Sequence, residues 1–233
     1  MATVEHADES VEGHLATISQ ALTEFRDKFA IQFIVSISGG AEEHNLGRVH
    51  QIVTSLIDGL RGAHCAILSG GTQGGIPELA TKIARQKKLP TIAVYPKNAR
   101  KYVLTEDIDL PIETLPPSLG KASFGTETPT FAQLPDYAVV IGGSYGTLAE
   151  VSTMLKVNTK RKKDEIEPIR IIPISGSDGI ADLIPQLVLL EPNLAYCLPA
   201  FPIRTGAEAA EHIIHHHNQK GVQNDKTPKA SFL

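Results

Sequence analysis

The chain contains no tryptophan, and aromatic residues make up only 5% of its 233 positions. This scarcity argues against a broad platform on which nucleic-acid bases would stack. Positive charge is not in excess either, because 26 acidic residues face 22 lysines and arginines, which argues against nucleic acid and anionic membranes as partners. The amino terminus is acidic rather than signal-like, and no apolar run approaches the roughly 20 residues that span a bilayer. We therefore expect a soluble, cytoplasmic protein with neither a nucleic-acid nor a membrane partner.

Cysteine is scarce, and its two copies, Cys65 and Cys197, lack the CxxC spacing of redox or metal sites. We expect both thiols to be reduced and buried.

Histidines are clustered near the carboxyl end, where His212 and His216 lie four residues apart, a spacing at which two ligands can share a metal. No acidic or cysteine residue lies at a spacing that completes such a site, so we expect neither a metal nor a cofactor.

Uncharged apolar segments alternate along the chain with segments of helical periodicity. The β-rich segments are 31–38, 64–69, 89–96, 137–143 and 169–175, with weaker ones near Ile112 and at 198–203. The helical segments are 9–28, 46–61, 77–88, 147–160, 181–190 and 206–217. Strands that are apolar on both faces and separated by helices predict an α/β fold. We expect a doubly wound, Rossmann-like and mostly parallel sheet in a single domain.

We divide the chain into an N-terminal amphipathic helix at 1–29, a main domain at 30–218 and a disordered tail at 219–233. Between 97 and 134 the periodicity decays, and prolines, glycines and mixed charges replace it. A stretch of this length without strong elements inside a compact domain is more often a functional loop than a simple connection.

Three of the predicted strands end in glycine-rich turns. The candidate binding residues on these turns are Gly39, Gly40, Gly70, Gly71, Thr72, Gln73, Gly74, Gly75, Gly142, Gly143, Ser144, Tyr145, Gly146 and Thr147. Ligands of such sheets bind at the carboxyl ends of the strands. A glycine turn that enters a helix lets backbone N–H groups approach an anion at the positive end of the helix dipole, so we expect these turns to hold phosphate. No turn carries the Walker or GxGxxG sequence, which disfavours a standard dinucleotide oxidoreductase.

Glu150 follows the third turn on the predicted helix and has two interpretations. Thr147 and Glu150 form the pattern of a capping box, in which the threonine caps the helix and the glutamate bonds back to the cap. Alternatively, Glu150 is a catalytic residue beside a bound ribose, where its carboxylate stabilises the cationic carbon that forms as a glycosidic bond breaks. Tyr145, inside the same turn, either stacks on a base or fills the gap to a neighbouring loop.

The stretch 136–150, DYAVVIGGSYGTLAE, resembles the SLOG superfamily, which includes the Lonely Guy-type phosphoribohydrolases once named lysine decarboxylases. The hallmark of these enzymes is PGGxGTxxE after a strand that begins with Asp, and Gly146, Thr147 and Glu150 match it. The segment 68–76, LSGGTQGGI, is similar to the earlier phosphate turn of the same enzymes. The resemblance implies a Rossmann-like fold with phosphate on both turns.

The chain departs from the hydrolases at the Arg-Lys pair that precedes their hallmark strand, because Glu127 and Thr128 occupy those positions. Arg100 or Lys101, from the long loop, could replace the lost cation, and we take Arg100 as the candidate. The first half, 34–76, is similar to the N-terminal SLOG region of melastatin-type transient-receptor-potential channels and to its prokaryotic stand-alone versions. This resemblance implies binding of nucleotide derivatives such as ADP-ribose.

Two functions follow from these resemblances. The first is a ligand-sensing module that binds an ADP-ribose- or NAD-related molecule or a nucleoside phosphate. The alternative is a phosphoribohydrolase, an N-glycosidase that cleaves nucleoside 5′-monophosphates or NAD-type ligands with assistance from Glu150. The replaced Arg-Lys pair and the channel-like first half favour binding over catalysis. Because relatives form dimers through helices beside the site, the resemblance also implies a homodimer or a higher homo-oligomer.

Overall fold

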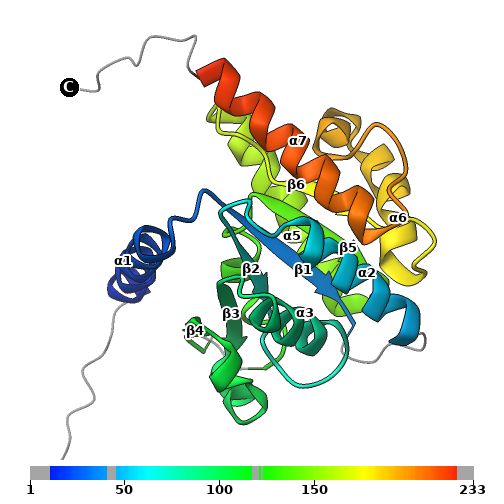
Figure 1. Cartoon of the computed structure of the whole chain (residues 1–233). Coiled ribbons are helices and arrows are strands. Elements are labelled where there is room, and N and C mark those ends of the chain that lie inside the picture. The colour runs from blue at the N-terminus through cyan, green and yellow to red at the C-terminus, as the bar shows by residue number, and fades with distance from the viewer. Residues whose placement is uncertain (1–10, 41–45, 117–120, 122, 225–233) are drawn as a thin grey trace, which may run out of the picture.

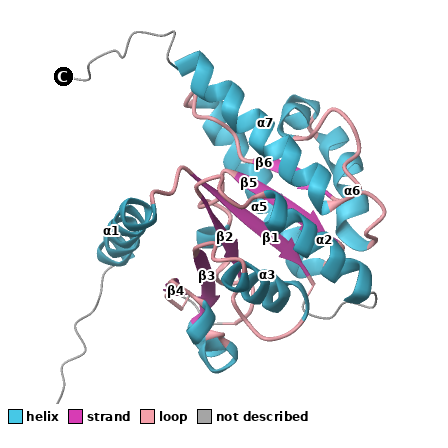
Figure 2. Cartoon of the chain, viewed as in Figure 1, coloured by secondary structure: helices cyan, strands magenta, loops and turns pink. Residues whose placement is uncertain are grey.

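Six strands form one sheet at the centre of the molecule (Figures 1 and 2). The computed structural model describes residues 11–40, 46–116, 121 and 123–224. The strands are β1 (Phe33–Gly39), β2 (Cys65–Ser69), β3 (Thr91–Pro96), β4 (Leu110–Thr114), β5 (Tyr137–Ile141) and β6 (Arg170–Pro173). Their order is β4-β3-β2-β1-β5-β6, and each pairing is parallel. The predicted Rossmann-like α/β fold in a single domain is confirmed.

Helices cover both faces of the sheet (Figure 1). They are α1 (Val11–Phe29), α2 (Leu46–Gly59), α3 (Gly75–Gln86), α4 (Thr128–Phe131), α5 (Tyr145–Lys163), α6 (Gly179–Leu187) and α7 (Gly206–Asn224). Apolar residues of α2, α3 and α7 form one core cluster with one face of β1. Those of α1, α4, α5 and α6 form the other cluster with the opposite face. Both faces of the central strands are therefore buried, which explains their continuous apolar sequences.

The strand order contains one reversal of direction, and it lies beside β1. From β1 the chain builds β2, β3 and β4 outward on one side, and it then returns to place β5 on the other side of β1. The ends of β1 and β5 are in register, with Gly39 opposite Ile141. In open parallel sheets a crevice forms at such a reversal, outside the carboxyl ends of the strands.

The long segment 97–134 consists of short elements that follow β3. It contains the 3-10 helices η1 (Lys97–Tyr102) and η2 (Thr105–Asp107), then β4, and finally α4. The strand expected at 198–203 is wrong: this segment makes a single parallel bridge, between Ile174 and Ile203. Its prolines at positions 199 and 202 lack the N–H group that a sheet ladder requires.

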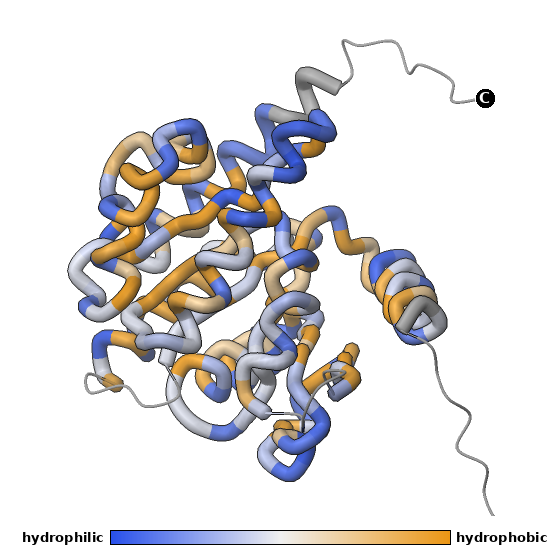
Figure 3. The backbone as a smooth tube through the Cα atoms, turned by 180° about the vertical axis from the view of Figure 1, so that it is seen from behind, coloured by the Kyte–Doolittle hydropathy of each residue, from blue (hydrophilic) through white to orange (hydrophobic). Residues whose placement is uncertain are grey.

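Helix α1 packs by its carboxyl-terminal half. Phe25 is 5% exposed, and Ile18, Leu22 and Phe29 pack around it against the sheet, whereas Leu15 is 54% exposed. Figure 3 shows this helix beside the main body with mixed apolar and polar residues along it. The division into a helix, a domain and a tail stays a proposal. Residues 219–224 belong to α7, and the rest of the predicted tail, 225–233, lies outside the described residues.

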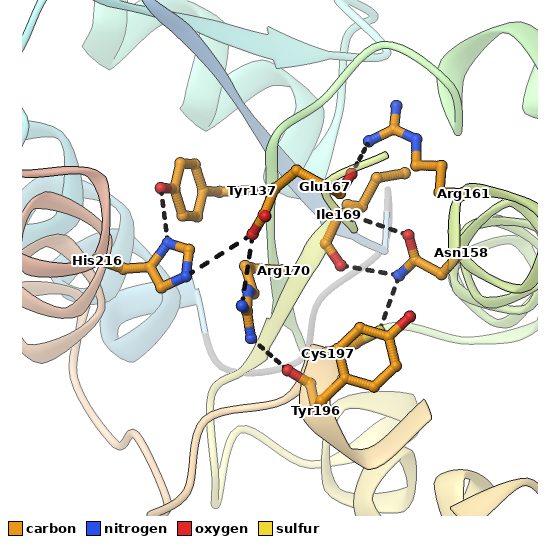
Figure 4. Close-up of polar contacts among 9 residues, drawn as sticks. All are labelled: Tyr137, Asn158, Arg161, Glu167, Ile169, Arg170, Tyr196, Cys197 and His216. Carbon is orange, nitrogen blue, oxygen red and sulfur yellow. Dashed lines mark hydrogen bonds and ion pairs between the residues drawn. The ribbon is translucent and has the colours of Figure 1, made fainter. Parts of the chain in front are cut away.

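The C-terminal histidines bind α7 to the sheet (Figure 4). His216 Nδ1 lies 3.0 Å from Tyr137 Oη, and its Nε2 lies 4.0 Å from Glu167 Oε1. The ring of His217 lies 4.3 Å from that of Phe33, measured between centroids. Within the described residues, no group of three or more His, Cys, Asp or Glu side chains is arranged to hold a metal. Every helix in that part of the chain is too short or too polar to traverse a bilayer.

Candidate functional site

A pocket of about 440 Å³ opens where β1, β2 and β5 end. Its walls come from the turns after β1 and β2, from the end of β3, from the first turns of α5 and from the segment around α4. This is the position that the reversal of strand order predicts for a ligand. The volume lies within the range of small-molecule sites, roughly 300–1,000 Å³. The glycine-rich turns therefore meet at one cavity.

The structure brings part of the predicted site together at this pocket. The predicted residues that line it are Gly39, Gly40, Gly70, Thr72, Ser144, Gly146, Thr147 and Glu150. The lining does not include the other predicted residues, Gly71, Gln73, Gly74, Gly75, Gly142, Gly143, Tyr145 and Arg100. A second, smaller cavity of about 240 Å³ between α6 and the segment 198–203 contains none of the predicted residues.

Gly71 and Gly143 do not line the pocket, but they allow the backbone conformation of the turns. At Gly71, with φ +61°, an added Cβ would lie 2.3 Å from Ala93 Cβ, so the turn after β2 packs directly on β3. At Gly143, with φ +89°, an added Cβ would lie 2.4 Å from Thr147 Oγ1. Both conformations are ones that L side chains rarely adopt. These glycines are therefore required for the shape of the turns.

The turn after β5 is fixed from behind by the segment that enters α6. Ser177 Oγ accepts a hydrogen bond of 2.8 Å from the Gly142 N–H. The carbonyls of Gly142 and Gly143 accept N–H donors from Ala181 at 3.0 Å and Ile180 at 3.1 Å. The carbonyl groups of this turn therefore point to α6, away from the start of α5.

Helix α5 begins at Tyr145, and Ser144 is its N-cap, without a hydrogen bond from the cap side chain. The capping-box interpretation is wrong, because Thr147 lies inside the helix and not at the cap position. The first N–H groups of a helix have no partner within it. Since Ser144, Gly146 and Thr147 line the pocket, this helix start presents such donors to its interior. Tyr145 is 87% exposed, so it does not fill a gap to a neighbouring loop.

Arg100 is not among the residues that line the pocket, although its charge acts on Tyr95, which does line it. Its Nε lies 3.2 Å from Glu113 Oε2, and its side chain is 73% exposed. Among the described residues, the pocket lining includes no lysine, arginine or histidine. The cation that the hydrolases place before their hallmark strand thus has no counterpart in this lining, and the positive potential must come from backbone N–H groups and the α5 dipole.

Two carboxyl groups face the pocket, from Glu150 on α5 and from Glu127 just before α4. Burial raises the pKa of Glu150 to about 7, the neighbouring Ser38 hydroxyl lowers it in part, and the charge of Glu127 raises it further. Burial also raises the pKa of Glu127, although the Gly125 N–H donates to its Oε2 at 2.8 Å. A carboxyl group that is half protonated near pH 7 can exchange protons with a ligand.

Sequence reasoning missed several lining residues outside the glycine-rich turns and the start of α5. These lining residues include Ser38, Phe124, Glu127, Thr128 and Phe131. Ser38 belongs to an apolar strand, and a polar residue in such a strand is the one signal that could have identified it. The others lie in the segment 97–134, whose position depends on tertiary contacts. The sequence analysis interpreted this segment as a functional loop, but it did not identify which of its residues line the pocket.

A parallel sheet with a pocket at its reversal point defines a Rossmann-like ligand-binding architecture. The SLOG cluster4 family matches residues 32–161, which is more than half of the chain, so the protein belongs to this family. The matched segment contains β1 to β5 and most of α5, and with them all residues that line the pocket. The predicted membership of the SLOG superfamily is confirmed. A comparison with curated protein sequences finds no match.

Solved structures share the fold at low sequence identity. The X-ray structure of TM1055 has a TM-score of 0.61 and 19% identity, over 79% of this chain and 99% of that one. The molybdenum cofactor carrier protein from Chlamydomonas reinhardtii has a TM-score of 0.55 and 19% identity, over 79% and 98%. DNA processing protein A from Helicobacter pylori has a TM-score of 0.53 and 16% identity, over 85% and 84%.

The comparison with DNA processing protein A corrects one expectation. The Helicobacter pylori structure is described as showing a single-stranded DNA binding mode, and it has the same fold as this chain. The exclusion of nucleic acid, drawn from the charge balance and the few aromatic residues, is therefore wrong. Net charge averages over the whole surface, whereas binding depends on the local arrangement of backbone donors and side chains.

Proposed function

We propose that the protein binds a nucleotide derivative in the pocket between the turns and acts as a ligand-sensing module. The observation that carries this proposal is the convergence of the glycine-rich turns after β1 and β2 and the start of α5 on one cavity of about 440 Å³. Backbone donors at a helix start favour a phosphate group. The ligand is an ADP-ribose- or NAD-related molecule or a nucleoside phosphate. The resemblance of residues 34–76 to the channel-type SLOG region supports ADP-ribose as one of these.

The named ligands of the structural relatives support an anionic ligand. One relative is a carrier of molybdenum cofactor and another binds single-stranded DNA, according to their descriptions. Both of these named ligands carry phosphate, as does the ligand proposed for this chain. A small molecule fits this site, because the turns and the segment before α4 line the pocket on several sides.

Calorimetry with ADP-ribose, NAD, nucleoside monophosphates and a single-stranded DNA oligonucleotide tests this proposal. We expect saturable heats with at least one nucleotide, and an absence of heat across the panel at several hundred micromolar would refute it. A second test is the variant Gly146→Asp, which places a carboxylate at the start of α5. A Cβ added at this position has no heavy atom within 4 Å, so the side chain fits without a clash. This variant should fold, since acidic residues suit helix starts, but bind at least about tenfold more weakly. The control is Ala149→Asp, which adds the same charge at an exposed position.

A second candidate function is N-glycosidase activity, and the pKa of Glu150 favours it. A carboxyl with a pKa near 7 suits general acid–base catalysis at neutral pH, an effect worth roughly 10²–10⁴-fold in rate. The residue would activate water for attack at the ribose carbon. Chromatography of reactions with AMP and NAD should then reveal free adenine or nicotinamide, and Glu150→Gln should abolish their release while binding persists. If the Glu150→Gln variant still releases free adenine or nicotinamide, Glu150 is not the residue that activates water.

A further inference from the structure

The inner end of the pocket has a chemistry opposite to that of its rim. Ser38, at the end of β1, is 2% exposed, yet its Oγ has no hydrogen-bond partner of ordinary geometry among the described residues. A contact from this hydroxyl to the Glu150 carboxyl, outside ordinary hydrogen-bond geometry, lowers the pKa of that carboxyl. A buried hydroxyl whose one contact is poorly aligned costs free energy, and at a pocket wall it marks a place where a ligand atom completes the bond.

Charge fixes the direction in which a ligand lies. The exposed Ser144 and Gly146 place the N–H donors of the α5 start at the rim, whereas the buried Ser38 and the carboxyl of Glu150, one helical turn beyond Gly146, form the inner end. Glu127 is a half-buried part of the wall. A phosphate cannot lie against two carboxyls, so it belongs on the rim, and the inner end receives the ring of the ligand. Gly146 and Glu150 are one helical turn apart, about 6 Å along the axis, so a ligand that reaches both exceeds a free phosphate in size.

The hydrogen-bonding groups at the inner end of the pocket determine which donors and acceptors the ring of the ligand must present to them. An ionised carboxylate only accepts hydrogen bonds, and its two oxygens accept in parallel from two adjacent N–H donors. The Ser38 hydroxyl, next to it, can donate to a carbonyl oxygen. We propose that Ser38 and Glu150 read the carbonyl, ring N–H and amino group of a 2-amino-6-oxopurine, so that the pocket selects a guanine-type nucleoside phosphate. This inference rests on the proposed function and names its ligand class.

Other common rings match the inner end less well. Adenine presents an acceptor next to a donor, so its ring nitrogen would face a carboxylate oxygen without a proton between them. Hypoxanthine retains the carbonyl and the ring N–H but lacks the amino group, so it would leave one carboxylate oxygen of Glu150 unpaired. Phe131, 2% exposed, and Phe124, 62% exposed, also line the pocket and offer apolar surface to a flat ring.

Protonation of Glu150 should alter this selectivity. The protonated carboxyl has only one accepting oxygen free, and its O–H suits the adenine acceptor instead. Since the pKa of this group is raised to about 7, mainly by burial and further by Glu127, guanine selectivity should be stronger at pH 8 than at pH 6. Ser38 contributes no charge. The ratio of two monophosphates at each pH cancels the ionisation of the phosphate itself.

The test is a titration of the full-length protein with GMP, IMP, AMP and nicotinamide mononucleotide at pH 6 and pH 8. We expect GMP to bind about tenfold more tightly than IMP at pH 8, because IMP leaves a buried acceptor unpaired, and the ratio should shrink at pH 6. Glu150→Gln should bring GMP to the affinity of IMP. Ser38→Ala should weaken GMP and IMP alike and leave AMP unchanged. Glu106→Gln, at an exposed position, is the control for loss of one negative charge.

Each outcome decides the inference. Equal affinities for GMP, IMP and AMP, or tightest binding of AMP or nicotinamide mononucleotide, would overturn the guanine assignment and leave nucleotide binding intact. Absence of binding by all four, together with ADP-ribose and NAD, would refute the proposed function and the assignment with it. If Glu150→Gln does not fold, as judged by circular dichroism, the pH dependence of the wild-type ratio and the Ser38→Ala variant still decide the question.

Discussion

Asn158 anchors α5, the helix that carries one wall of the pocket, and its replacement by leucine should destabilise the protein strongly. The side chain is fully buried and bonds both polar groups of one residue: Nδ2 donates to the Ile169 carbonyl at 2.8 Å, and Oδ1 accepts from the Ile169 N–H at 2.8 Å. Nδ2 also lies 3.1 Å from Cys197 Sγ (Figure 4). Leucine has a similar volume but leaves the N–H and the carbonyl of Ile169 buried without partners.

The magnitude follows from these two backbone groups. Each buried group without a partner costs about 1–3 kcal/mol, and burial of the leucine side chain offsets part of the total. We expect Asn158→Leu to lower the free energy of unfolding by about 3 kcal/mol. For a domain of this size the midpoint of thermal unfolding should fall by roughly 6–12 °C.

Thermal and urea unfolding followed by circular dichroism measure this loss. The control is Thr153→Ala on the same helix, which removes a hydroxyl bond of 2.7 Å to the Ala149 carbonyl and should change stability by no more than about 0.5 kcal/mol. A midpoint for Asn158→Leu within about 2 °C of the wild-type value would show that the bridge between α5 and β6 does not stabilise the fold. An equal loss in both variants would attribute the effect to the helix and not to the bridge.

Three further predictions concern the turns and the pocket. Gly71→Ala should lower the free energy of unfolding by about 2–3 kcal/mol in urea titrations, because its Cβ would overlap Ala93, whereas Gly62→Ala, with φ +80° and open space around it, should cost only about 1 kcal/mol. Because the folded pKa of Glu150, about 7, exceeds its ordinary value of 4.5, the folded state binds the extra proton between these values, and stability should fall as pH rises from 4.5 to 7. Glu150→Gln should remove this fall, which amounts to about 3 kcal/mol, and equal pH profiles of unfolding would contradict the pKa. Arg100→Ala should leave nucleotide affinity in calorimetry within about twofold, because its guanidinium pairs with Glu113 at the surface; a tenfold loss would place it at the ligand.

The sequence predicts the fold and the rim of the pocket because both depend on local patterns. Apolar strands buried on two faces and glycines at their ends are visible along the chain, and the turn residues Gly39, Gly70 and Gly146 follow from them. The inner end depends on contacts between distant segments. Ser38 is one polar residue in an apolar strand, and Glu127 lines the same pocket although it lies far from Ser38 in the sequence.

The error at the start of α5 has a local cause. Thr147 and Glu150 have the spacing of a capping box, but the helix begins earlier, at Tyr145, because the turn at Gly142 and Gly143 is fixed by α6. The helix therefore starts a few residues before the position that the capping pattern predicts, and a local pattern cannot account for tertiary hydrogen bonds of this kind. The same shift leaves Glu150 without a role in the cap and directs its carboxyl to the pocket.

The hydrogen bonds from the start of α6 to the carbonyls of Gly142 and Gly143 also affect the thermodynamics of association. A bend whose carbonyls already have partners has little conformational entropy left to lose when a ligand arrives. The heat-capacity change on complex formation should therefore correspond to the apolar area covered in the pocket, without an added contribution from ordering this bend. In this respect the side of the cavity next to the start of α5 is preorganised, and the affinity for the proposed ligand should depend chiefly on the groups that the ligand offers.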